Sequence, residues 1–171
     1  ANEEMTAWMR GERSMPFGHN NEHVPVRLID LDDLAQNQYV VTQQYTYRAG
    51  PTERRADLVL LVNGLPLVLI EAKTPVKKCI SWVDGAVQVH DDYVKLVPEL
   101  FVCNVFSVAT EGKEFRFGSI GLPVKDWGPW HLESDAAGSG DVLHHPLKSL
   151  KLSAQSMLRP AVVLDILASF T

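Results

Sequence analysis

The stretch RADLVLLVNGLPLVLIEAK, residues 55–73, decides the fold of this chain. Two apolar runs flank Asn63-Gly64, and Asn-Gly between such runs is the strongest short-range signal for a β-hairpin. Both faces of each run are apolar along most of its length, which is typical of strands in the centre of a sheet. The sequence therefore predicts two neighbouring central strands, at residues 56–62 and 66–73.

Other segments have the periodicity or the residue types of strands and helices. The expected strands are 38–47, 100–109 and 114–120, and the expected helices are 3–9, 80–97, and one or two in 147–170 interrupted at Pro160. After the first helix we expect much irregular structure up to residue 36, because the connection contains proline and glycine. We also expect a flexible surface segment at 136–141.

Composition and charge limit the classes of function. A chain of 171 residues with 46% hydrophobic and 22% charged residues is typical of a soluble globular domain. The net charge of −5 argues against a protein that wraps nucleic acid by bulk electrostatics. The basic residues that flank the hairpin form either a local basic lip near DNA or ordinary solvated ends of strands and helices. They are Arg54, Arg55, Lys73, Lys77 and Lys78.

The sequence also predicts a cytoplasmic protein with no membrane partner. No apolar run approaches the roughly 20 residues that a membrane-spanning helix needs, and the first residues do not resemble a secretion signal. The two cysteines, Cys79 and Cys103, lie in mostly apolar neighbourhoods. We expect both to be buried free thiols.

Three polar side chains stand at one end of the expected hairpin. Asp57 begins one strand, and Glu71 and Lys73 end its partner. Side chains alternate along a strand, so Glu71 and Lys73 point the same way. Burying an unpaired carboxylate costs several kcal/mol of free energy, so acids at the ends of central strands indicate a functional site.

The register of the hairpin decides whether the two acids meet. A two-residue turn at Asn63-Gly64 would pair Asp57 with Ile70 and set Glu71 on the opposite face. A three-residue loop over 63–65, with a residue in the left-handed region and a bulge, would pair Asp57 with Glu71. Since opposed carboxylates repel unless a cation intervenes, a metal site requires the odd-numbered loop.

These residues predict the hydrolysis of a phosphodiester. The carboxylates of Asp57 and Glu71, with the carbonyl of Ala72, would offer oxygen ligands to Mg²⁺. Such an ion activates a bound water and neutralises charge developing on phosphate. Lys73 would hold the attacking water or oppose the phosphate's charge. The alternative is a structural ion pair between lysine and carboxylate at a sheet end.

Over these residues the chain resembles the PD-(D/E)XK nucleases and, more narrowly, the N-terminal region of type I restriction enzyme R subunits. The centre Val-Asn-Gly-Leu-Pro-Leu, residues 62–67, is its most specific part, and the similarity covers roughly residues 24–120. The resemblance implies an α/β (α+β type) fold with a mixed central sheet flanked by helices. It also implies Mg²⁺-dependent cleavage of double-stranded DNA, with Asp57 and Glu71 as metal ligands and Lys73 as the catalytic lysine.

The same resemblance implies a larger protein. Residues 1–146 would be the endonuclease domain, and 147–171 a helical connector toward an ATP-dependent translocase outside this chain. The partners would be the methyltransferase (M) and specificity (S) subunits, and cleavage would follow translocation without sequence specificity. The alternatives are an inactive docking module of the same fold and a stand-alone repair or recombination nuclease.

The chain departs from the family pattern at two points. Ala56 stands where the superfamily has proline, and Gln88 and Tyr93 are one residue further apart than in the family's Gln-x-x-x-Tyr element, which lies near DNA. Five residues of α-helix rotate by about 500°, so we expect Tyr93 to diverge from Gln88 by about 140°. Some such nucleases carry a further acid on an early helix, and by position alone the candidates are Glu3, Glu4, Glu12 and Glu22. The alternative, which we favour for each, is an ordinary solvated surface acid.

Overall fold

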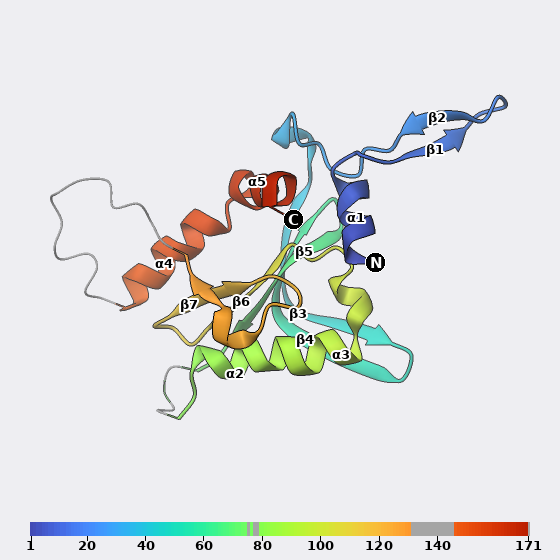
Figure 1. Ribbon diagram of the computed structural model, residues 1–171. Coiled ribbons are helices and arrows are strands. Elements are labelled where there is room, and N and C mark those ends of the chain that lie inside the picture. Colours follow the sequence, from blue (N-terminus) through green and yellow to red (C-terminus); the bar gives the residue numbers. More distant parts are fainter. Residues whose placement is uncertain (75, 77–78, 131–145, 171) are drawn as a thin grey trace, which may run out of the picture.

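The computed structural model describes residues 1–74, 76, 79–130 and 146–170, and its centre is one mixed sheet (Figure 1). Six strands lie in the order β3-β4-β5-β6-β7-β8. Their bounds are Tyr39–Ala49, Thr52–Val62, Leu65–Ala72, Phe106–Thr110, Phe115–Gly118 and Gly128–Pro129. Only β5 and β6 pair in parallel, and the other neighbours are antiparallel. The prediction that the hairpin β4-β5 is central is confirmed.

Helices cover both faces of the sheet (Figure 1). The helices are α1 Asn2–Met9, α2 Trp82–Val87, α3 Val94–Leu96, α4 Pro146–Met157 and α5 Pro160–Phe170, with a π-helix, η2, at Gln88–Tyr93. Helix α2 begins with a capping box in which Ser81 accepts from the backbone of the first turn and Asp84 binds back to Ser81. As expected, the chain is helical on both sides of Pro160.

Two hydrophobic cores lie on the two faces of the sheet. The first core joins α1 and α5 to the sheet and includes Met9, Val68, Ile70, Leu164 and Leu167. The second core joins the α2-η2 segment to the sheet and includes Ala56, Val59, Leu69, Val89 and Tyr93. Strand β5 contributes to both cores, which explains its continuous apolar run.

The strand predicted from residue 100 begins only at Phe106. Pro98 opens a 3-10 helix, η3, over Pro98–Phe101, because proline suits the first position of a helical turn. The buried Asn104 then donates from its side chain to the carbonyls of Leu67 and Phe106. The hairpin β6-β7 itself is confirmed.

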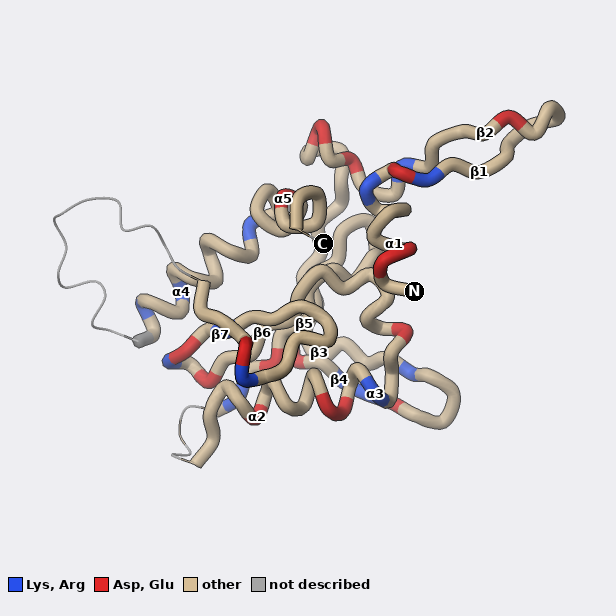
Figure 2. Tube along the Cα trace, viewed as in Figure 1, with Lys and Arg blue, Asp and Glu red and all other residues tan. Residues whose placement is uncertain are grey.

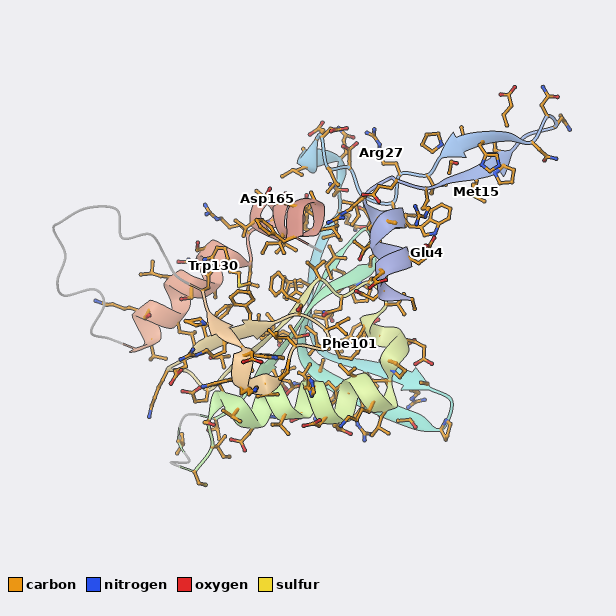
Figure 3. The ribbon with its side chains drawn as sticks, in the orientation of Figure 1. Glu4, Met15, Arg27, Phe101, Trp130 and Asp165 are labelled. Atoms are coloured by element: carbon orange, nitrogen blue, oxygen red, sulfur yellow. The ribbon has the colours of Figure 1, made fainter. Side chains whose placement is uncertain are left out.

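The early segment holds a hairpin that the sequence does not predict. Strands β1 (Ser14–Phe17) and β2 (Glu22–Pro25) pair with each other and project away from the sheet, with Met15 on the projection (Figures 1 and 3). All eight of their residues are exposed, so the alternating pattern that marks a half-buried strand does not arise.

Two further expectations have different outcomes. Cys79 is exposed and Cys103 half-buried, so the expectation of two buried thiols is wrong for Cys79, which lies in a turn after β5. The surface segment expected at 136–141 lies outside the described residues. In the described part of the chain, no helix combines the length and the apolar character needed to cross a membrane.

Candidate active site

The turn between β4 and β5 differs from the expected three-residue loop. Val62 pairs with Leu65, so only Asn63 and Gly64 lie in the turn, both at positive φ (51° and 82°). Positive φ at both central positions is the conformation of a type I′ turn, which asparagine and glycine adopt readily. Taken alone, this turn would have placed the two acids on opposite faces.

A bulge at Leu67 restores the register that brings the acids together. Leu61 pairs with Pro66, but Leu60 pairs with Val68, so Leu67 is the extra residue on β5. A β-bulge sets two residues of one strand against one of its partner. Beyond it, Leu58 pairs with Ile70, and extending this register by one step sets Asp57 opposite Glu71, close enough for its carboxylate to affect that of Glu71.

The bulge is held by side chain and backbone together. The side chain of Leu67 is fully buried in the first core. Its carbonyl accepts hydrogen bonds from the Val105 amide (2.8 Å) and from Asn104 Nδ2 (3.2 Å). Pro66 has no N–H to lose from the ladder at this irregular point. Contacts from the two residues just before β6 therefore fix the relation of Asp57 to Glu71.

Asp57 is partly exposed and is held by both neighbouring strands. Its Oδ2 accepts from the backbone amide of Ala72 on β5 at 2.9 Å. Its Oδ1 accepts from Nε2 of Gln44 on β3 at 3.1 Å. The sequence did not single out Gln44, because nothing in a strand pattern distinguishes it from the neighbouring Gln43.

Glu71 is a buried carboxylate beneath helix α2. Only 1% of the residue is exposed, and Gly85 of α2 comes so close that a Cβ there would lie 3.4 Å from the Cβ of Glu71. Burial raises the pKa of Glu71 to about 7, with a further increase from the Asp57 carboxylate and opposing effects of the Tyr93 hydroxyl and Lys73.

The two oxygens of Glu71 have different partners. Oε2 accepts from Lys73 Nζ at 3.3 Å. Oε1 is buried and has no hydrogen-bond partner among the described residues. An unsatisfied buried oxygen near a second carboxylate fits a site for a cation, which would supply the missing interaction. Within the described residues no group of three or more His, Cys, Asp or Glu gathers as a metal site, but Mg²⁺ needs only one or two carboxylates because it keeps several waters.

Lys73, Gln88 and Tyr93 form a connected polar group beside Glu71. Lys73 Nζ donates to Gln88 Oε1, and Gln88 Nε2 donates to the Tyr93 hydroxyl. That hydroxyl donates in turn to the carbonyl of Arg55 at 2.8 Å. Burial raises the pKa of Tyr93, so its hydroxyl stays protonated and can donate.

The expectation that Tyr93 diverges from Gln88 is wrong. Residues Gln88–Tyr93 form a π-helix, in which bonds run from each residue to the fifth one along, so the two side chains share a face. The five-residue spacing was itself the available signal for this widened turn. In an α-helix the same spacing would point the two side chains apart, which is what we had expected.

The structure describes only part of the expected basic lip. The Arg54 guanidinium binds Asp92 through two hydrogen bonds of 2.8 and 2.7 Å, so its charge is already paired. Arg55 is exposed, and Lys77 and Lys78 lie outside the described residues. In Figure 2 the lysines and arginines of the described residues are spread along the trace.

The early acids lie far from this site. Helix α1, which carries Glu4 (Figure 3), is anchored by Asn2, whose side chain donates to the carbonyls of Phe101, Val102 and Asn104. These residues precede β6, whereas Glu71 pairs near its end, with Ala109. Glu4 is bound to Arg13 at 3.0 Å, and Glu22 lies on the projecting hairpin. In this arrangement none of the early acids joins Asp57 and Glu71.

Comparison with known proteins gives a consistent family. The family described as type I restriction enzyme R protein N terminus matches residues 1–121. The type I restriction enzyme HindI endonuclease subunit of Haemophilus influenzae is 28% identical over 147 residues, which is 85% of this chain. A Methanocaldococcus jannaschii protein named for the MjaIXP endonuclease subunit is 29% identical over 120 residues, 68% of the chain.

These relatives are much longer than the present chain. The chain spans 14% of the Haemophilus protein and 11% of the Methanocaldococcus protein. A second Methanocaldococcus protein, named for the MjaVIIP endonuclease subunit, is 31% identical over 83 residues, which cover 48% of this chain and 8% of that protein. The likeness therefore concerns a small part of each relative.

Proposed function

This chain belongs to the family of type I restriction enzyme R protein N termini, and on that premise we propose that it is a Mg²⁺-dependent nuclease domain that hydrolyses double-stranded DNA. The observation that carries the proposal is that Asp57 lies close enough to the buried, partly unsatisfied Glu71 to raise the pKa of its carboxyl. A partly exposed carboxylate thus lies beside a buried one, so an ion held by both could keep waters on its open side. A PD-(D/E)XK arrangement of the mixed sheet is part of the same proposal.

Each site residue has a role in this proposal. Asp57 and Glu71 would hold the ion, with the carbonyl of Ala72 as a third ligand. When bound, Mg²⁺ supplies a water of lowered pKa and neutralises charge on the phosphate. Glu71 must give up its proton before it can bind a cation, because burial raises its pKa to about 7.

Lys73 is placed to act on the attacking water or on the phosphate. Its ammonium group binds Glu71 Oε2 at 3.3 Å and also Gln88. A cation at Glu71 would weaken the first contact, while Gln88 would keep the ammonium near the carboxylates. Lys73 would then hold the water or oppose the charge that develops on the phosphate.

The proposed setting is a type I restriction system. Cleavage would lack sequence specificity and follow ATP-driven translocation by other parts of the polypeptide, and M and S subunits would complete the complex. The small share of the relatives that this chain spans supports this larger setting. In it, residues 147–171 would connect the domain to the translocase.

An inactive docking module remains the competing function. It would be favoured by acids on opposite faces of the sheet, or by a Lys73 buried away from Glu71. The shared register of Asp57 and Glu71 and the contact from Lys73 to Glu71 favour hydrolysis instead.

Alanine variants in the assembled enzyme test the proposal. Asp57→Ala, Glu71→Ala and Lys73→Ala should each abolish DNA cleavage and leave ATP-dependent translocation nearly intact. Asp165→Ala, which alters an exposed acid on α5, is the matched control and should cut normally. If any of the three variants cuts DNA at the parent rate, the role assigned to that residue is wrong.

A further inference from the structure

Gln44 has a backbone conformation that is unusual for its position. Its φ is +53°, in the left-handed region, although it lies inside the long strand β3. Outside glycine such values are uncommon, and Asn, Asp and His adopt them several-fold more often than other residues. The flanking pairs are Gln43 with Leu58 and Tyr45 with Ala56, so the residue opposite Gln44 is Asp57.

The β3-β4 ribbon changes faces at this point. Ala56 and Leu58 are two residues apart and would share a face in a regular strand. Instead Ala56 lies in the second core and Leu58 packs against the first core. Gln44 and Asp57 thus lie at the point where the two strands of the ribbon exchange the faces that they present to the two cores.

The twist brings the Gln44 amide to one oxygen of Asp57. Nε2 of Gln44 donates to Oδ1 at 3.1 Å, while the Ala72 amide donates to Oδ2 at 2.9 Å. One donor comes from each neighbouring strand, so the carboxylate is held on both sides. Each oxygen still has a lone pair for a second partner.

We propose that Gln44 is a positioning residue that orients the Asp57 carboxylate for the divalent ion. This inference rests on the proposed function. A strained backbone conformation persists where the surrounding structure enforces it, and such residues gather at functional sites. Here the strain accompanies a hydrogen bond to a carboxylate that would bind the metal. Removing such a supporting partner typically weakens metal binding by about 10-fold or more.

Two variants separate the hydrogen bond from the strain. Gln44→Met keeps the size and the strained backbone but removes the donor, whereas Gln44→Gly removes the donor and tolerates positive φ. The matched control is Gln43→Met, because Gln43 is an exposed glutamine on the same strand that makes no side-chain hydrogen bond within the described residues.

Calorimetric titration with Mn²⁺ and thermal unfolding give the decisive pair of readouts. Both Gln44 variants should bind Mn²⁺ about 10-fold more weakly, although the thermal midpoint of Gln44→Gly should be equal to or above that of Gln44→Met. Gln43→Met should match the wild type in affinity. Wild-type affinity for Mn²⁺ in both Gln44 variants would overturn the proposal. So would a loss of affinity that is found only in the variant with the lower thermal midpoint.

A metal-free measurement keeps this test distinct from that of the proposed function. In NMR spectra of the metal-free protein, the Asp57→Asn change should shift the side-chain amide resonances of Gln44 and leave those of Gln43 in place. If the Gln44 resonances do not respond, the positioning contact is absent. If they respond but Glu71→Gln leaves Mn²⁺ binding unchanged, the proposed metal site fails and the inference about metal positioning fails with it.

Discussion

The side-chain amide of Gln88 donates to the hydroxyl of Tyr93, although the two lie five positions apart along the chain. They meet because the intervening residues form a π-helix instead of an α-helix. Single π-turns inside helices occur often at functional sites. Here the widened turn returns Tyr93 to the face that carries Gln88, next to Lys73 and Glu71.

Removing one residue from this turn should be tolerated. Deletion of His90 would set Gln88 and Tyr93 four residues apart, which places them on one face of an ordinary α-helix. We expect cooperative thermal unfolding and retained DNA cleavage by the assembled enzyme. Insertion of one alanine after His90 should instead separate the two side chains and lower cleavage. An unfolded deletion variant, or one without cleavage, would contradict this account of the π-turn.

The Tyr93 hydroxyl should stabilise the fold. It is buried and bonds both Gln88 and the carbonyl of Arg55, so Tyr93→Phe should lower the free energy of unfolding by about 1–2 kcal/mol. Urea denaturation measures the change. Tyr47→Phe is the control, since within the described residues the Tyr47 hydroxyl has no hydrogen bond. An equal loss in both variants would show that the Tyr93 bonds contribute nothing specific.

Asn104 should matter because it anchors the bulge. Its buried side chain donates to the carbonyls of Leu67 and Phe106 and accepts from Ser107. Asn104→Ala would leave the two carbonyls with fewer partners and should destabilise the protein by about 1–3 kcal/mol. Chemical denaturation tests this against Asn20→Ala, an exposed control. A negligible change in Asn104→Ala would mean that the bulge does not need this anchor.

The stability of the metal-free protein should fall as pH rises toward neutrality. The pKa of Glu71 is about 7 in the folded protein and near its ordinary value of 4.5 when unfolded. Between these values the folded state binds more protons, so stability present at low pH is lost as pH rises through about 7. The difference corresponds to about 3 kcal/mol as an order of magnitude.

Glu71→Gln is the control for this effect, because glutamine does not titrate. Denaturation of both proteins between about pH 4.5 and 8 should give a difference in stability that grows with pH. Mn²⁺ binding to the wild type should strengthen over the same interval, since the ion competes with the proton. Parallel pH profiles of the two proteins would contradict the raised pKa.

The hairpin was predictable because its signals are local. Asn63-Gly64 and the two apolar runs indicate the turn and the central strands without knowledge of the rest. The register was not predictable in the same way. The bulge at Leu67 depends on Asn104 and Val105, which lie far along the sequence and meet it only in the folded sheet.

The site was predictable to a similar extent. The residue types and alternation of Asp57, Glu71 and Lys73 indicated three side chains at one end of the hairpin, and the structure brings them together. Gln44 was missed because the residue types around it do not indicate a positive φ within a strand. The ion pair of Arg54 was not predictable because its partner Asp92 belongs to η2, 38 residues further along the chain.

The most direct test of the central claim is to locate a bound ion. Crystals of the wild type and of Glu71→Gln, soaked in Mn²⁺ above pH 7, can be compared by anomalous scattering. The account predicts a peak in the wild type within bonding distance of both Asp57 and Glu71, and no such peak in Glu71→Gln. A wild-type crystal with no peak between these carboxylates, or a peak unaffected by the substitution, would contradict it.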